Sequence, residues 1–214
     1  MPGTKQANSI DSQVLARIKA RGRGWVFSPG DFADLGSATA IHLALMRNSR
    51  RGVIRRLTRG LYDYPRKHPE LGMLAPSLDA VAKAVQSRDG SRVLPTGALA
   101  ANLLGLSDQV PARAVFLTDG RARLVRIGNQ HIVFQRRGSR TMATAERPSG
   151  PLIQALDFLG PAHVDDQVIA TLRRRFDRDQ LRGMAKDAKY APGWIAAIMR
   201  ELASGAEDGD VTHG

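Results

Sequence analysis

The residues with the clearest chemical signal are arginines near the N-terminus. Between positions 47 and 59 the chain carries six arginines and no acidic residue. A guanidinium group donates two parallel hydrogen bonds to phosphate oxygens, and a run of such groups without acids repels itself on a surface that meets only water. The pattern therefore predicts a polyanionic partner, although any one of these arginines is equally explained as a solvated charge.

The charge of the whole chain agrees with this interpretation. The 214 residues include 32 Lys and Arg against 20 Asp and Glu, which gives a net charge of +12 and a pI near 11.1. Residues 1–66 hold 12 of the basic residues and only 4 acidic ones. Nucleic acid is the usual partner of such a segment. An acidic membrane surface is the alternative, but no basic amphipathic helix with aromatic anchors is evident.

Local signals place these arginines on regular elements. A first helix, a short strand and a second, short helix are predicted before a longer helix over Ala38–Arg50, and residues 53–57 and 61–64 are predicted as the strands of a hairpin. Three serines supply N-caps for the helices: Ser9, Ser28 and Ser37. This order of elements is typical of a winged helix-turn-helix, which we predict over residues 9–65.

The longer helix and the hairpin are the parts that would meet DNA. The exposed side of the helix would lie in the major groove, with polar side chains at base edges and apolar ones at thymine methyl groups. The arginines at the end of the helix and in the hairpin, or wing, would bind phosphates. The predicted DNA-binding residues are Ser37, Thr39, His42, Leu43, Met46, Arg47, Arg50, Arg51, Arg55, Arg56, Arg59 and Tyr62. The alternatives are that Leu43 and Met46 are core or interface residues, and that the domain binds a protein and not DNA.

The remainder of the chain has a different composition and predicts a second domain. Residues 66–76 are interpreted as a linker and residues 77–203 as a mixed domain with several helices and a small antiparallel sheet, whose strands are joined by hairpin turns at Asp119-Gly120 and Gly128-Asn129. Residues 1–8 and 204–214 are predicted to be flexible tails. The expected fold class is therefore α+β.

No pattern that carries catalysis is found. The histidines are not spaced as a metal pair, and the acidic pairs Asp165-Asp166 and Asp177-x-Asp179 are explained by helix capping and salt bridges. A nuclease would need an acid on a central strand followed by an acid-x-Lys pair, whereas Asp119 lies in a turn. We therefore expect no enzyme activity, no cofactor and no metal. The five histidines are His42, His68, His131, His163 and His213.

Two further absences bear on location. The chain has no cysteine, which excludes disulfides and thiolate zinc sites. Its N-terminus lacks the apolar segment of a signal peptide, and no stretch is apolar enough to cross a membrane. A cytoplasmic protein without membrane contact is expected.

Three segments resemble the AbiEi family, the antitoxins of abortive-infection toxin–antitoxin systems of type IV. They are VFSPGDFADLGSATAIHLALMRNSRRGVIRRLTRGLYDYP, LPTGALAANLLGLSDQVPARAVFLTDGRARLVRIGNQHIVFQRR and APGWIAAIMREL. The resemblance covers roughly residues 10–203. It implies a winged helix that binds repeats in the promoter of its own operon and represses it, and a C-terminal domain that counters a nucleotidyltransferase-like toxin in phage defence.

The resemblance leaves two questions open. Neutralisation in this family is described as not requiring a stable complex, but an antitoxin that masks its toxin by direct contact is the alternative, and a monomer or a dimer would serve on DNA. Two positions depart from the family pattern. Asn48 replaces an apolar residue, so it is either hydrogen-bonded or part of a looser helix end, and His42 stands where an acid or amide is expected.

Overall fold

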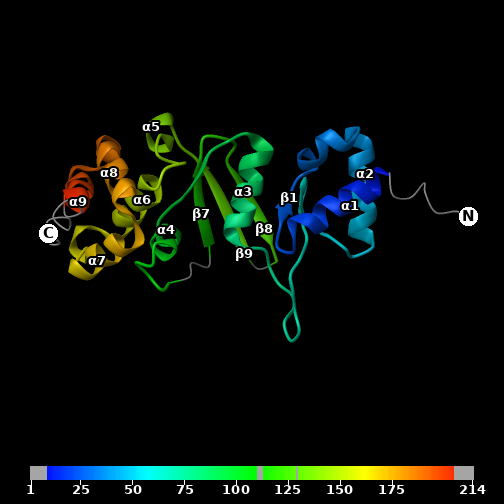
Figure 1. The fold of residues 1–214 in the computed structure, drawn as a ribbon, viewed down its shortest axis with the longest axis horizontal. Coiled ribbons are helices and arrows are strands. Elements are labelled where there is room, and N and C mark those ends of the chain that lie inside the picture. The colour runs from blue at the N-terminus through cyan, green and yellow to red at the C-terminus, as the bar shows by residue number, and fades with distance from the viewer. Residues whose placement is uncertain (1–8, 110–112, 129, 205–214) are drawn as a thin grey trace, which may run out of the picture. The chain divides into compact units, whose positions relative to one another are not determined.

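The structure is a computed structural model that describes residues 9–109, 113–128 and 130–204. The fold is α+β, as predicted, and the chain forms two compact units (Figure 1). The N-terminal unit consists of Met1–Ser91 and Val125–His131, and the C-terminal unit of Arg92–Leu124 and Ile132–Gly214. Of the predicted tails, residues 1–8 and 205–214 lie outside the described residues.

Capping serines begin the helices of the N-terminal unit. Helix α1 (Ile10–Arg21) begins at Ser9, whose hydroxyl accepts a hydrogen bond from the backbone of Ser12 at 3.2 Å. After strand β1 (Val26–Phe27), Ser28 and Asp31 form a capping box at the start of the 3-10 helix η1 (Pro29–Leu35). Helix α2 (Ala38–Arg50) has the predicted bounds, and Ser37 caps it. These local predictions are confirmed.

A three-stranded antiparallel sheet completes this part of the unit. Strands β2 (Arg55–Thr58) and β3 (Leu61–Asp63) form the hairpin, and the strand order is β1-β3-β2. Strand β2 begins two residues later than predicted because the N–H groups of Val53 and Ile54 both donate to the carbonyl of Asn48, at 3.0 and 3.4 Å. Those two residues therefore close helix α2 instead of pairing with β3.

Helices α1 and α2 bury their apolar sides against the sheet. The shared core includes two aromatic pairs, with Phe27 in contact with both Phe32 and Tyr62. Burial of this many apolar side chains is the main source of stability for a unit of this size. The buried members of the cluster are Val14, Ile18, Phe27, Phe32, Ile41, Ala44, Leu45, Ile54 and Tyr62.

The segment interpreted as a linker contains structure of its own. Residues 67–73 form a small hairpin from β4 (Lys67–His68) and β5 (Gly72–Met73). Leu71, in the turn between these strands, is 72% exposed. Helix α3 (Leu78–Asp89) follows, capped by Ser77 as predicted. The sequence interpretation assigned this helix to the second domain, but it packs within the N-terminal unit, where it contacts β1.

The C-terminal unit contains most of a four-stranded sheet and a group of helices. Helix α4 (Ala98–Leu103) lies between β6 (Val93–Pro95) and β7 (Arg113–Thr118) in the chain, and β8 (Arg123–Ile127) and β9 (Gln130–Arg136) follow. All four strands were predicted within two residues. Their order, β6-β7-β9-β8, was not.

The predicted hairpin between β7 and β8 is wrong, because β9 lies between these strands. The N–H of Arg137, which follows β9, donates to the carbonyl of Thr118 at the end of β7, at 2.8 Å. Strands β7 and β9 therefore end at the same edge and run in the same direction, so the sheet is mixed and not wholly antiparallel. Of the predicted turn at Gly128-Asn129, Asn129 lies outside the described residues.

The predicted C-terminal helices are confirmed. They are α6 (Ser149–Leu159), α7 (Asp166–Arg175), α8 (Arg178–Asp187) and α9 (Gly193–Ser204), and α6 also packs against α4. A short helix, α5 (Ser139–Met142), lies in a stretch for which no element was predicted, and 3-10 turns occur at η2 (Pro161–His163) and η3 (Ala188–Tyr190). Within residues 9–109, 113–128 and 130–204, no helix is long and apolar enough to cross a membrane.

An ion pair between α1 and η1 gives a prediction for acid titration. The Arg17 guanidinium donates to both carboxylate oxygens of Asp34 at 2.6 Å, and this hydrogen bonding lowers the pKa of Asp34 to about 2. The carboxyl carbon of Asp34 is therefore expected to titrate in NMR with a midpoint near pH 2. In Arg17→Ala the midpoint should rise to roughly 3.9, the unperturbed value.

The sign of the effect on stability follows from the lowered pKa. The pair stabilises the folded state fully above about pH 4 and loses this contribution as the pH falls toward the folded pKa. Both side chains are accessible to solvent, so the contribution is small. A midpoint for Asp34 that is the same in the wild type and in Arg17→Ala would contradict the assignment.

Candidate nucleic-acid interface

One side of helix α2 is exposed along its length. Thr39, Leu43, Met46 and Arg50 follow the three- and four-residue spacing that places side chains on one helical stripe. Thr39 and Arg50 are exposed, Leu43 is 42% exposed and Met46 is half-buried, so Leu43 is not a core residue. His42 is also exposed beside this stripe. The inward side of the helix carries Ile41, Ala44 and Leu45, together with the buried polar residue Asn48.

The serine at the start of α2 has a structural role that is compatible with exposure. The Ser37 hydroxyl accepts a hydrogen bond from the N–H of Ala40 at 3.3 Å and thereby caps the helix. The side chain itself is exposed. The N-terminal turn of α2 therefore presents a hydroxyl and the positive end of the helix dipole to solvent.

Asp11 of helix α1 partly neutralises two of the predicted phosphate-binding residues. Its carboxylate lies 3.3 Å from Nε of Arg47 and 3.1 Å from Nη1 of Arg51. The two guanidinium groups stay more than half exposed. They can therefore reach a ligand, but their charge is shared with an acid that lies 36 or more residues earlier in the chain.

Arg55 is not placed as a phosphate ligand, contrary to the prediction. Its Nε and Nη2 atoms donate to the two carboxylate oxygens of Asp63 at 3.1 and 2.6 Å, and Nη2 also donates to the carbonyl of Leu74 at 2.9 Å. The Asp63 side chain is only 1% exposed. Arg55 thus supplies the counter-charge for a buried carboxylate and joins the hairpin to the segment before α3.

Arg56 and Arg59 are exposed on the hairpin. Arg56 lies directly opposite Tyr62 in the strand register, and residues opposite each other share a face of the sheet. Because Tyr62 packs against the helices, Arg56 lies on the helix side of the sheet, where α2 also lies. Arg59 occupies the turn together with Gly60, whose φ of 75° suits glycine. The backbone carbonyl of Arg59 accepts a hydrogen bond from the Arg88 guanidinium.

Tyr62 and Asn48 are core residues. Tyr62 is 3% exposed and stacks on Phe27, so its placement as a DNA contact is wrong in this structure. Asn48 is fully buried, and its side-chain amide donates to the carbonyl of Ala44 at 2.9 Å, which answers the question of how it is accommodated. Its Oδ1 atom finds no hydrogen-bond partner among the described residues.

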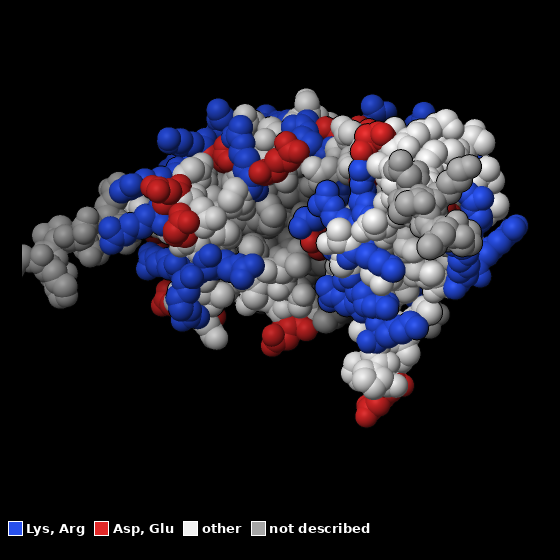
Figure 2. Space-filling view, turned by 45° about the vertical axis from the view of Figure 1, so that its right-hand side comes forward, with Lys and Arg blue, Asp and Glu red and all other residues white. Residues whose placement is uncertain are grey.

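Three of the predicted arginines thus have no acidic partner in the part of the chain that the structure describes. Two of the remaining basic residues of the unit are held on aromatic rings, since Arg21 lies over Trp25 and Arg23 over Tyr64. Figure 2 shows lysine and arginine side chains gathered on the visible face of the N-terminal unit, at the right, with few acidic ones among them. The three arginines without an acidic partner among the described residues are Arg50, Arg56 and Arg59. These three arginines and the exposed stripe of α2 form what we call the α2–hairpin surface.

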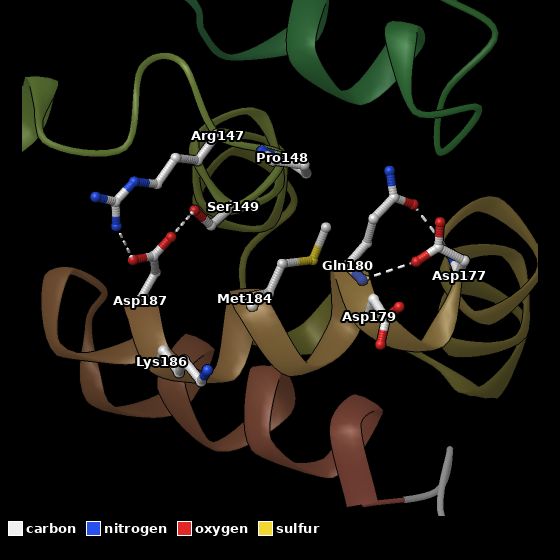
Figure 3. A pocket seen from close by; sticks show the side chains of 10 residues that line it. Arg147, Pro148, Ser149, Asp177, Asp179, Gln180, Met184, Lys186 and Asp187 are labelled. Carbon is white, nitrogen blue, oxygen red and sulfur yellow. Dashed lines mark hydrogen bonds and ion pairs between the residues drawn. The ribbon is translucent and has the colours of Figure 1, made fainter.

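Acidic residues of the C-terminal unit serve as helix caps and ion-pair partners, and Figure 3 shows Asp177 with its partner Gln180. Asp177 begins α8 and exchanges hydrogen bonds with Gln180, and Asp179 lies 3.5 Å from Arg182. Asp165 caps α7 by accepting a hydrogen bond from the N–H of Val168 at 2.9 Å. The predicted capping and ion-pairing roles of these acids are confirmed.

The pocket drawn in Figure 3 is built around a buried carboxylate. Asp187 at the end of α8 is 4% exposed and accepts hydrogen bonds from Arg147 and from the hydroxyl of Ser149. Both of its oxygens are engaged, so the network fastens the start of α6 to the end of α8. Over the described ranges, no group of three or more His, Cys, Asp or Glu residues is placed to hold a metal ion.

Comparison with known proteins identifies a family. No curated protein matches the sequence. A family model described as a family of unknown function, DUF6088, matches residues 13–182. The match takes in the α2–hairpin surface and most of the C-terminal unit. Since it spans well over half of the 214 residues, the chain belongs to the DUF6088 family.

Proposed function

We propose that the N-terminal unit is a winged helix-turn-helix that binds duplex DNA through the α2–hairpin surface. The order of its elements and the strand order β1-β3-β2 support this proposal, because a winged helix presents one helix and one hairpin on the same side. The observation that carries it is the exposed stripe of α2, which ends in Arg50 on the side of the sheet where Arg56 is also exposed.

The chemistry of the stripe suggests a division of tasks on DNA. Thr39 and His42 can hydrogen-bond base edges in the major groove, and Leu43 can meet a thymine methyl group. The arginines supply sequence-independent affinity by neutralising phosphates, while the helix supplies selectivity. A surface with both kinds of group is expected to bind a preferred sequence, and a purely charged surface is not.

A mobility-shift experiment tests this function. The DNA directly upstream of the gene is compared with random DNA of equal length, at a stated and moderate salt concentration. The upstream DNA is expected to bind at least roughly tenfold more tightly, because specific sites typically exceed non-specific DNA by far more than that. Equal affinity for the two fragments would rule out a sequence-specific regulator, and absence of any shift would rule out DNA binding.

The resemblance to AbiEi antitoxins supports a narrower proposal, in which the protein represses its own operon in the cytoplasm and counters a nucleotidyltransferase-like toxin. The C-terminal unit would carry the second task. Co-expression with the product of a neighbouring toxin gene should restore growth. Purification of the two proteins as a stoichiometric complex would favour neutralisation by direct contact, and separate elution would favour neutralisation without it.

A further inference from the structure

A second concentration of arginines lies in the C-terminal unit, at one edge of the four-stranded sheet. Strand β6 begins at this edge, because Val93 pairs with Thr118 at the end of β7, and β9 ends there as well. The three strand ends and the start of α5 enclose an open pocket of about 480 Å³. The residues that line it are Arg92, Asp119, Arg136, Arg137, Gly138 and Ser139.

One arginine of this pocket has its own counter-charge. Asp119 accepts hydrogen bonds from the backbone N–H and from Nε of Arg92, both at 2.8 Å. Burial alone would raise the pKa of Asp119, but these hydrogen bonds and the charge of Arg92 outweigh it and lower the pKa. The Arg92–Asp119 pair is therefore neutral overall and fixes the wall of the pocket.

The other two arginines are not neutralised. Among the described residues, the Arg137 guanidinium donates to uncharged oxygens, Oε1 of Gln135 at 3.1 Å and the carbonyl of Arg136 at 3.0 Å, and to no carboxylate. Arg136 is exposed and has no acidic partner within the described ranges. Two more exposed arginines flank the pocket, Arg121 in the loop after β7 and Arg140 in α5. The edge thus carries a net positive charge of its own, separate from the α2–hairpin surface.

We propose that this arginine-lined pocket is a second nucleic-acid site, which binds phosphate groups of a polynucleotide backbone. Guanidinium groups held by neutral acceptors keep N–H donors for phosphate oxygens. None of the described residues that line the pocket is aromatic or large and apolar, so a base has no surface on which to stack. The further arginines beyond the pocket, in the loop after β7 and in α5, suit a chain of phosphates better than a single phosphate.

The test compares two double variants of the full chain. Arg136→Ala/Arg137→Ala removes the two uncompensated charges, and the matched control Arg174→Ala/Arg200→Ala removes two exposed charges from α7 and α9. Affinity is measured by fluorescence anisotropy on labelled random duplex DNA and on labelled single-stranded RNA, over a series of salt concentrations. Thermal unfolding checks that each variant is folded, and Arg136→Lys/Arg137→Lys keeps the charge.

The pocket variant is expected to lose roughly tenfold or more in affinity near 0.1 M salt, with the salt slope reduced by roughly 0.7 to 0.9 for each lost phosphate contact. The control variant should stay within about twofold, and the lysine variant should recover most of the loss. A loss confined to DNA or to RNA identifies the polymer that the site takes. Random-sequence probes make the result independent of any operator sequence. Failure of this proposal can therefore be distinguished from failure of the proposed function.

Two results would overturn the proposal. If affinity and salt slope for both polymers change no more in the pocket variant than in the control, the pocket does not contact a backbone. If inorganic pyrophosphate displaces the polymers at a concentration equal to their own dissociation constants, the pocket is a site for small anions and not for a polynucleotide.

Discussion

Simultaneous replacement of Arg50, Arg56 and Arg59 by alanine is expected to weaken duplex DNA binding by a few hundredfold near 0.1 M salt. Each arginine that neutralises a phosphate contributes about 0.9 to the slope of log affinity against log salt, so the slope should fall by roughly 2.7. These three are chosen because they are exposed and have no acidic partner among the described residues. Mobility shifts or anisotropy at several salt concentrations give both quantities.

Two comparison variants make this expectation specific. Arg113→Ala/Arg174→Ala/Arg200→Ala removes the same charge from the C-terminal unit and should change the affinity several-fold at most. Asp11 already shares the charge of Arg47 and Arg51, so Arg47→Ala/Arg51→Ala should cost less than two free phosphate contacts would. A triple variant of the α2–hairpin surface that binds DNA like the control would exclude that surface from the interface.

Features fixed by neighbouring residues were predictable from the sequence. Ser37 caps α2, and the bounds of that helix follow from its capping serine and the glycine after it, because an N-cap and a glycine beyond the C-terminus act within one turn. The capping roles of Asp165 and Asp177 were predictable for the same reason. The exposed stripe of α2 follows from helical periodicity alone.

Features fixed by distant residues were not predictable. The hydrophobic pattern does not show that β9 inserts between β7 and β8, because strand order depends on which edges meet. The six arginines between positions 47 and 59 look alike in the sequence. They differ in the structure because Asp11 and Asp63 reach only some of them.

The same distinction separates Arg55 from its neighbour Arg56 and leads to an expected loss of stability. Arg55→Ala should lower the free energy of unfolding of the N-terminal unit by about 3 kcal/mol, because it leaves the buried Asp63 carboxylate without its counter-charge. Arg56→Ala removes an exposed side chain and should change it by less than about 0.5 kcal/mol. Denaturant unfolding followed by Trp25 fluorescence in a Trp194→Phe background reports on this unit alone.

The order of the two effects should be reversed for DNA binding: Arg56→Ala should weaken binding, and Arg55→Ala should not. Folded Arg55→Ala protein, kept well below its unfolding midpoint, is expected to retain the wild-type salt slope, whereas Arg56→Ala should reduce that slope by roughly 0.9. Arg55→Met/Asp63→Leu removes both charges and should recover much of the stability, since replacing a buried ion pair by apolar side chains is often close to neutral. If Arg55→Ala is as stable as the wild type but has a reduced slope, Arg55 contacts phosphate and the structural role of its pair with Asp63 is refuted.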